Sequence, residues 1–71
     1  ELGARPTRAL RTRKRKYIQT LDERTRSKIE FEELYDLERD PGERNNLASR
    51  PESAAVLDEM KARLSRLAAT L

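Results

Sequence analysis

The sequence IEFEELYDL, at residues 29–37, decides the fold class of this chain. Apolar residues recur there at even spacing with acidic residues between them: Ile29, Phe31, Tyr35 and Leu37. This period of two is typical of a half-buried β-strand, and Glu33, which interrupts the apolar series, predicts a bend or bulge. Asp40, Pro41 and Gly42 then predict a turn, because proline fixes φ and glycine permits positive φ.

Two shorter strands are expected upstream of this segment. Residues 8–21 are rich in Thr, Tyr, Ile and Leu, and a tight turn near Arg13 and Lys14 would divide them into a pair of strands. Residues 22–28 (DERTRSK) are wholly polar and indicate a solvated loop. Residues 1–7 contain a glycine and a proline without any period, so we expect an incoming connection there.

A long helix is expected downstream of the turn. Ser49 and Glu52 have the spacing of a capping box, and Pro51 falls in the first turn, where its missing N–H costs nothing. Residues 45–48 are expected to form a turn or a single helical turn that leads to this start. The apolar residues that follow alternate spacings of three and four: Leu57, Met60, Leu64, Leu67 and Leu71, with Val56 and Ala68 beside them. This pattern predicts one apolar stripe along a helix of about five turns.

The order of elements predicts an α+β fold, with a small antiparallel sheet of three to four strands covered by one long C-terminal helix. We expect one domain over residues 1–71, with its parts in this order: 1–7 as incoming connection, 8–37 as antiparallel strands, 38–49 as turn segment and 50–70 as helix. Only 35% of the residues are apolar, so the core is thin. The isolated chain is therefore expected to be weakly stable or to self-associate through an exposed sheet face.

The composition excludes several classes of function. The chain has no cysteine and no histidine, which removes disulfides, thiolate zinc or redox sites, and imidazole acid/base chemistry. No run is apolar enough to span a membrane, and no membrane partner is expected. The chain begins at Glu1 without a signal-like segment, so an excised or mature fragment is expected and its cellular location stays open.

Basic residues are concentrated in the first part of the chain. Residues 1–28 hold ten Lys and Arg against three Asp and Glu, whereas residues 29–50 hold three against seven. The run RTRKRK at residues 11–16 could bind phosphates, but no aromatic residue interrupts it for base stacking. On a strand its side chains would alternate between two faces. A solvated or domain-facing basic strand is therefore the preferred interpretation, and a stand-alone module that binds nucleic acid or an acidic protein is the alternative.

The acidic stretch at residues 36–40 resembles the opening of a calcium loop, but it fails in detail. Such a loop needs Gly at its sixth position and Glu at its twelfth, where this chain has Pro41 and Leu47. Nothing in so small a domain would desolvate these carboxylates enough for acid/base catalysis. The sequence thus assigns no catalytic, cofactor-binding or metal-binding residue.

Two motifs make the chain resemble a known family. Residues 33–48 (ELYDLERDPGERNNLA) are similar to the ELYDL-x-x-DP-x-E-x-x-NLA segment near the C-terminus of the sulfatase family, within the alkaline phosphatase superfamily. Arg11 and Thr12, followed by residues 16–18 (KYI), resemble the RT-x-x-x-KYI strand upstream. Arg13 and Arg15 depart from that pattern, where a small residue and an aromatic residue are usual.

The resemblance, which covers residues 7–71, implies a noncatalytic C-terminal subdomain of an arylsulfatase-like sulfuric ester hydrolase. It implies about four antiparallel strands under one helix, and a partner in the catalytic domain of the same chain, near the substrate entrance. The parent would use calcium and a formylglycine made from the Cys or Ser of a Cys/Ser-x-Pro-x-Arg motif. This chain lacks that motif, because its closest string, residues 49–53 (SRPES), ends in Ser53.

The resemblance leaves two properties of the parent open. Related phosphonate monoester hydrolases share a similar C-terminal segment, so the resemblance favours sulfate esters without excluding phosphonate esters as the parent's substrate. Family members are cytoplasmic, periplasmic, secreted or lysosomal, and the resemblance does not choose among these locations.

Overall fold

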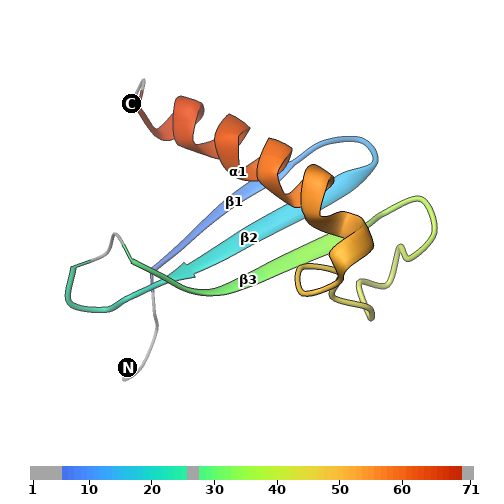
Figure 1. Cartoon of the computed structure of the whole chain (residues 1–71), viewed down its shortest axis with the longest axis horizontal. Helices are drawn as coiled ribbons and strands as arrows, with labels where there is room; N and C mark the ends of the chain where they lie inside the picture. The colour runs from blue at the N-terminus through green and yellow to red at the C-terminus, as the bar shows by residue number, and fades with distance from the viewer. Residues whose placement is uncertain (1–5, 26–27, 70–71) are drawn as a thin grey trace.

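The computed structural model describes residues 6–25 and 28–69, without the side chains of residues 68 and 69. The elements are β1 (Thr7–Arg11), β2 (Arg15–Leu21), β3 (Ile29–Asp36), the short 3-10 helix η1 (Pro51–Ser53) and α1 (Ala54–Ala69). The strands form an antiparallel sheet in the order β1-β2-β3, and α1 crosses one face of it (Figure 1). The α+β fold expected from the sequence is therefore confirmed. The expectations for residues 1–5, 26, 27, 70 and 71, and for the side chain of Ala68, lie outside what the structure describes.

The turn between β1 and β2 is where the sequence placed it. Thr12 donates its N–H to the Arg15 carbonyl at 2.8 Å, and its Oγ1 accepts the N–H groups of Lys14 at 3.3 Å and Arg15 at 3.1 Å. One hydroxyl thus holds the backbone that reverses direction between the strands. The predicted break near Arg13 and Lys14 is confirmed.

The irregularity in the sheet is not at Glu33. The pairing of β2 with β3 shifts between Thr20 and Leu21, near the loop that joins these strands. Glu33 keeps regular register opposite Ile18, and its Oε1 accepts a hydrogen bond from the Tyr35 hydroxyl. Because its side chain is only partly buried, the carboxylate fits a regular strand, and the predicted bend or bulge at this residue is wrong.

The core lies between the sheet and α1. Its buried centre consists of Tyr17, Leu34, Met60 and Leu64, and partly buried residues pack around it: Leu10, Leu47, Ala48, Val56 and Leu57. Most of the predicted helix stripe therefore faces the sheet. Leu67 is 51% exposed, because the last turns of α1 pass beyond β1 (Figure 1).

The start of the helix differs from the predicted capping box. The N-cap residue is Arg50, which makes no side-chain capping bond, and Pro51 occupies the first position of η1. Ser49 is exposed and lies one residue too early to cap the helix. Backbone bonds from the Arg50 N–H to Leu47 and from the Ser53 N–H to Arg50 form the entry instead. A proline-led 3-10 turn therefore replaces the predicted capping box.

Candidate functional site

Residues 46–48, which we call the return segment, follow the loop after β3 and lie along the outer edge of that strand. Asn46 Oδ1 accepts the N–H groups of Leu34 and Ala48, each at 3.0 Å, and Asn46 Nδ2 donates to the Glu32 carbonyl at 3.1 Å. Leu47 then donates its own N–H to the Leu34 carbonyl at 2.8 Å. The segment thus satisfies backbone groups that an edge strand would otherwise leave unpaired. Residues 45–47 form neither of the turns expected at 45–48, whereas a turn does include Ala48 and is closed by the bond from the Arg50 N–H to the Leu47 carbonyl.

The loop before this segment is organised by Asp40. Its carboxylate accepts the backbone N–H of Arg44 at 2.9 Å and that of Asn45 at 2.9 Å. These hydrogen bonds, and secondarily the positive charge of Arg44, hold the pKa of the Asp40 carboxyl below its usual range. Between Asp40 and Arg44, the backbone of Glu43 adopts a positive φ of 55°. The acidic motif therefore shapes a loop.

The other acidic residues near this loop are also engaged internally. Asp36 Oδ1 accepts the N–H groups of Glu38 at 3.1 Å and Arg39 at 3.3 Å, and Glu43 pairs with Lys16 Nζ at 3.1 Å. Over residues 6–25 and 28–69, no three carboxylates come together in an arrangement suited to a metal ion.

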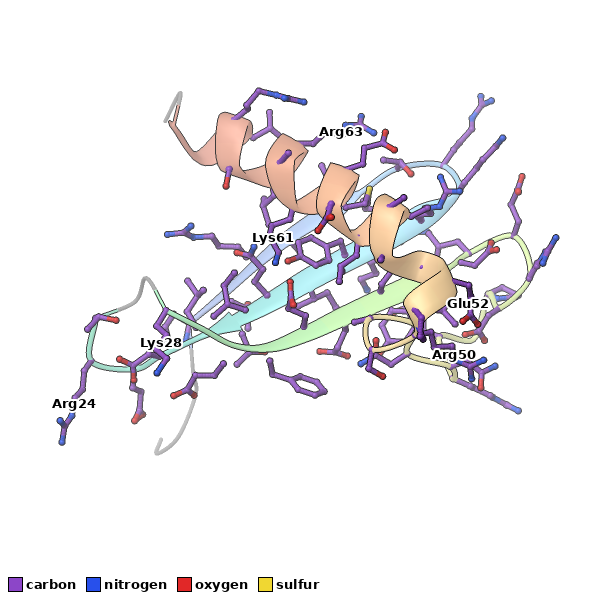
Figure 2. The ribbon with its side chains drawn as sticks, viewed as in Figure 1. Arg24, Lys28, Arg50, Glu52, Lys61 and Arg63 are labelled. Carbon is purple, nitrogen blue, oxygen red and sulfur yellow. The ribbon has the colours of Figure 1, made fainter. Side chains whose placement is uncertain are left out.

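A chain of polar groups links the sheet to the helix. Gln19 Nε2 donates to the Tyr17 hydroxyl at 3.0 Å, the hydroxyl donates to Glu32 Oε2, and Lys61 Nζ lies 3.4 Å from the same oxygen. Figure 2 shows Lys61 between α1 and the sheet. Burial, together with the bond to Glu32, raises the pKa of the Tyr17 hydroxyl above its usual value, so it stays a donor. This series of two hydrogen bonds and one ion pair stabilises the contact between α1 and the sheet.

A shallow depression of about 390 Å³ lies between the end of β3 and the start of the helix. Its floor is partly apolar, and both signs of charge line it: Arg15, Arg39 and Arg50 with Asp36, Asp40 and Glu52. Figure 2 places Arg50 and Glu52 near the helix start. Because these charges balance, the depression favours no ligand of one sign.

The basic run is divided by the sheet. Arg15 pairs in register with Asp36 and faces the helix side, whereas Lys16 points to the opposite face, where it binds Glu43. Arg11, Arg13 and Lys14 remain exposed at the hairpin. The expected alternation between two faces is confirmed for Arg15 and Lys16.

No helix of the described residues covers the face of the sheet away from α1 (Figure 1). Strand alternation places six residues of this open sheet face side by side: Ala9, Ile18, Thr20, Phe31, Glu33 and Tyr35. Phe31 is 56% exposed, although aromatic side chains are ordinarily well buried. The hydrogen bond to Glu33 raises the pKa of Tyr35 to about 12, so this hydroxyl also stays protonated. The open sheet face is the strongest candidate contact surface.

Two structural residues escaped the sequence analysis. Asn46 is a fixed position of the ELYDL-x-x-DP-x-E-x-x-NLA motif and Asn45 a variable one, which was the signal available, but the motif does not show which bonds Asn46 makes. The sequence pattern predicted for Glu32 only a polar position on an alternating strand. In the structure its carboxylate accepts a hydrogen bond from the Tyr17 hydroxyl and forms an ion pair with Lys61. Its partners come from distant parts of the sequence, so only the fold brings them together.

Comparison with known protein families gives a match over nearly the whole chain. A family model described as "N-sulphoglucosamine sulphohydrolase, C-terminal" matches residues 2–70. A search of curated proteins finds no match. In the described residues, no helix is long and apolar enough to cross a membrane.

Proposed function

The chain belongs to the N-sulphoglucosamine sulphohydrolase C-terminal family, and we propose that it is a noncatalytic subdomain of a sulfatase-like sulfuric ester hydrolase. Its main partner would be the catalytic domain of the same parent chain. Since the family description names a sulfated amino sugar, sulfated sugars are the substrate class we propose for the parent.

The noncatalytic role is supported by how the chain uses its polar groups. The carboxylates of Asp36 and Asp40 accept backbone N–H groups, while Glu32 and Glu43 bind lysines. The sequence supplies no cysteine, and residues 49–53 lack the arginine of the formylglycine motif. The residues present therefore do not fit the formylglycine and calcium that the family resemblance implies. We place that chemistry in the catalytic domain.

The exposure of Phe31 is the observation that carries the proposed contact. Burying a phenylalanine side chain contributes about 1.5–3 kcal/mol, and Ile18 lies on the same open sheet face. A sheet with helix cover on one face only leaves this apolar surface for another layer. We propose that the catalytic domain provides that layer and that one end of the subdomain borders the substrate entrance.

The first test is the coding sequence upstream of Glu1. We expect a long open frame that encodes a Cys/Ser-x-Pro-x-Arg motif together with Asp or Asn metal ligands. A start codon immediately upstream would contradict the proposal, and would favour a stand-alone interaction module instead.

The second test places a charge on the open sheet face of the full-length protein. Phe31→Asp is expected to raise amide hydrogen exchange in β2 and β3 at least about tenfold, because a buried carboxylate would weaken the contact. Phe31→Leu should retain most of the protection. Ala62→Asp places the same charge on an exposed helix position and is the matched control. Equal effects of the two aspartates would refute packing through this face.

A further inference from the structure

The tip of the β1-β2 hairpin presents three positive charges on an ordered turn. Arg11, Arg13 and Lys14 are all exposed, and Thr12 Oγ1 fixes the backbone between them. In Figure 1 this tip is the blue-to-cyan turn, at the end of the sheet opposite the loop between β2 and β3. We call these three basic residues the hairpin cations.

The hairpin cations make no ion pair with the described residues, in contrast to three other basic residues of the chain. Lys16 is 3.1 Å from Glu43, Lys61 is 3.4 Å from Glu32, and a weaker pair joins Arg39 to Asp36 at 3.9 Å. None of the hairpin cations takes part in an ion pair with the described residues. Their charge is therefore available to a ligand.

The acidic residues at the same end of the molecule do not cancel this charge. Leu37 donates its N–H to the Lys14 carbonyl at 2.7 Å, which brings the exposed Glu38 close in the chain to the tip. The other carboxylates at this end lie beside cations of their own: Asp36 beside Arg39, Asp40 beside Arg44 and Glu43 beside Lys16. One exposed carboxylate against three cations leaves the tip positive.

We propose that the hairpin cations bind anionic groups of a multiply sulfated saccharide, at a distance from the sulfate that is hydrolysed. This inference rests on the proposed function, because it assigns the tip to the parent's substrate. Guanidinium groups bind sulfate and carboxylate oxygens through paired hydrogen bonds, and the lysine adds a point charge. Arg11 extends from the strand that carries Ala9 on the open sheet face, so the tip lies at the border of the proposed domain contact.

The placement of the aromatic residues favours a saccharide over a single-stranded nucleic acid. Tyr17 is fully buried and Tyr35 is 9% exposed, so neither offers a free ring. Phe31 pairs in register with Thr20, toward the other end of β2. A single-stranded nucleic acid gains much of its affinity from stacking on aromatic rings, and none is available at this tip. Sulfated sugars need only the charges.

The experiment titrates a heparin-derived hexasaccharide into the full-length protein and into a variant with Arg11→Gln, Arg13→Gln and Lys14→Gln. We expect Kd to rise about tenfold or more, since each lost exposed contact weakens binding several-fold. The slope of log K against log salt should become less steep by about 2, because three charges no longer release counterions. Replacing both arginines by lysine should keep the salt slope but lose part of the affinity, because an ammonium group keeps the charge without the paired hydrogen bonds.

The matched control removes three cations elsewhere, by Arg24→Gln, Lys28→Gln and Arg63→Gln. Figure 2 shows Arg24 and Lys28 at the far end of the sheet and Arg63 on the helix. The Kd of this variant should stay within about twofold of that of the unaltered protein. Equal losses in both variants, or no hexasaccharide binding by the unaltered protein, would overturn the inference. Equally tight binding of a single-stranded oligonucleotide through the tip would overturn it in favour of nucleic acid.

The binding assay does not depend on whether the proposed function is correct. A coding sequence without the formylglycine motif would refute the sulfatase parent even if the hexasaccharide bound at the tip. Conversely, the parent could prove to be a sulfatase while the variant without the hairpin cations binds the hexasaccharide with unchanged affinity. That result would refute the inference and leave the proposed function standing.

Discussion

At the scale of single residues, Asn46 is the clearest structural determinant. Its amide reaches Leu34 and Ala48 with one atom and Glu32 with the other, so one side chain joins the return segment to β3. An ionised aspartate would offer no donor to the Glu32 carbonyl, and a serine would have to serve all three partners through a single oxygen atom. The side chain acts in place of a further strand at this point of the edge.

Replacing Asn46 by alanine should loosen this edge locally. Asn46→Ala leaves the Leu34 N–H without a partner, and a part-buried unpaired group costs about 1–3 kcal/mol. We expect amide exchange at Leu34 and Ala48 to rise at least about tenfold in the full-length protein. Asn45→Ala, which removes an exposed side chain one residue earlier, is the control. Equal exchange in the two variants would show that the edge does not depend on Asn46.

The local sequence pattern does not distinguish Asn46 from Asn45, although the family motif fixes the first and leaves the second variable. Both follow the turn at Pro41 and Gly42, and neither lies in a periodic segment. The difference arises because the chain passes β3 with Asn46 facing the strand. Alternation within β3, by contrast, depends on nearest neighbours, so the sequence predicted that strand correctly.

At the scale of elements, the start of the helix is the weakest junction. Arg50 has extended backbone angles, φ −85° and ψ 131°, which suit an N-cap residue, but its side chain provides no capping bond. A positive charge there also opposes the helix dipole. The prediction of a capping box failed because the structure shifts the start by one residue relative to Ser49.

Substituting Arg50 by aspartate should stabilise the domain. Arg50→Asp supplies an acceptor for the first N–H groups and a favourable charge at the helix N-terminus, together worth about 1 kcal/mol. We expect a higher urea midpoint by circular dichroism. Arg50→Ala separates loss of the positive charge from gain of the cap. If alanine raises the midpoint as much as aspartate, capping plays no part.

The apolar stripe of α1 was easier to predict than its start. Met60 and Leu64 are buried because helical spacing alone puts them on one side, whatever sheet they meet. The exposure of Leu67 was not predictable, since it depends on where the sheet ends beneath the helix.

At the scale of the whole molecule, we expect the open sheet face to determine whether the isolated chain self-associates. We expect the separate 71-residue chain to show concentration-dependent sedimentation and a low, broad thermal transition, because Phe31 stays exposed in the monomer. Phe31→Asp should reduce the self-association. A sharp melt at high temperature with a monomeric mass at micromolar concentration would contradict this expectation.

The layer arrangement followed from the sequence, but the occupant of the open sheet face did not. Alternation in β3 and the helix stripe predict one sheet and one helix, because each needs a face to bury. No pattern within these 71 residues identifies the surface that we propose to cover Phe31. The single-domain boundaries also remain a prediction.

The strand order β1-β2-β3 has a consequence for how quickly the domain forms. Every strand pairs with its neighbour in the chain, so each pairing closes a short loop and none waits for a distant partner. Domains with such local contacts reach the native state faster than sheets with crossovers. Formation of this three-stranded meander should therefore not be the slow step when the polypeptide folds.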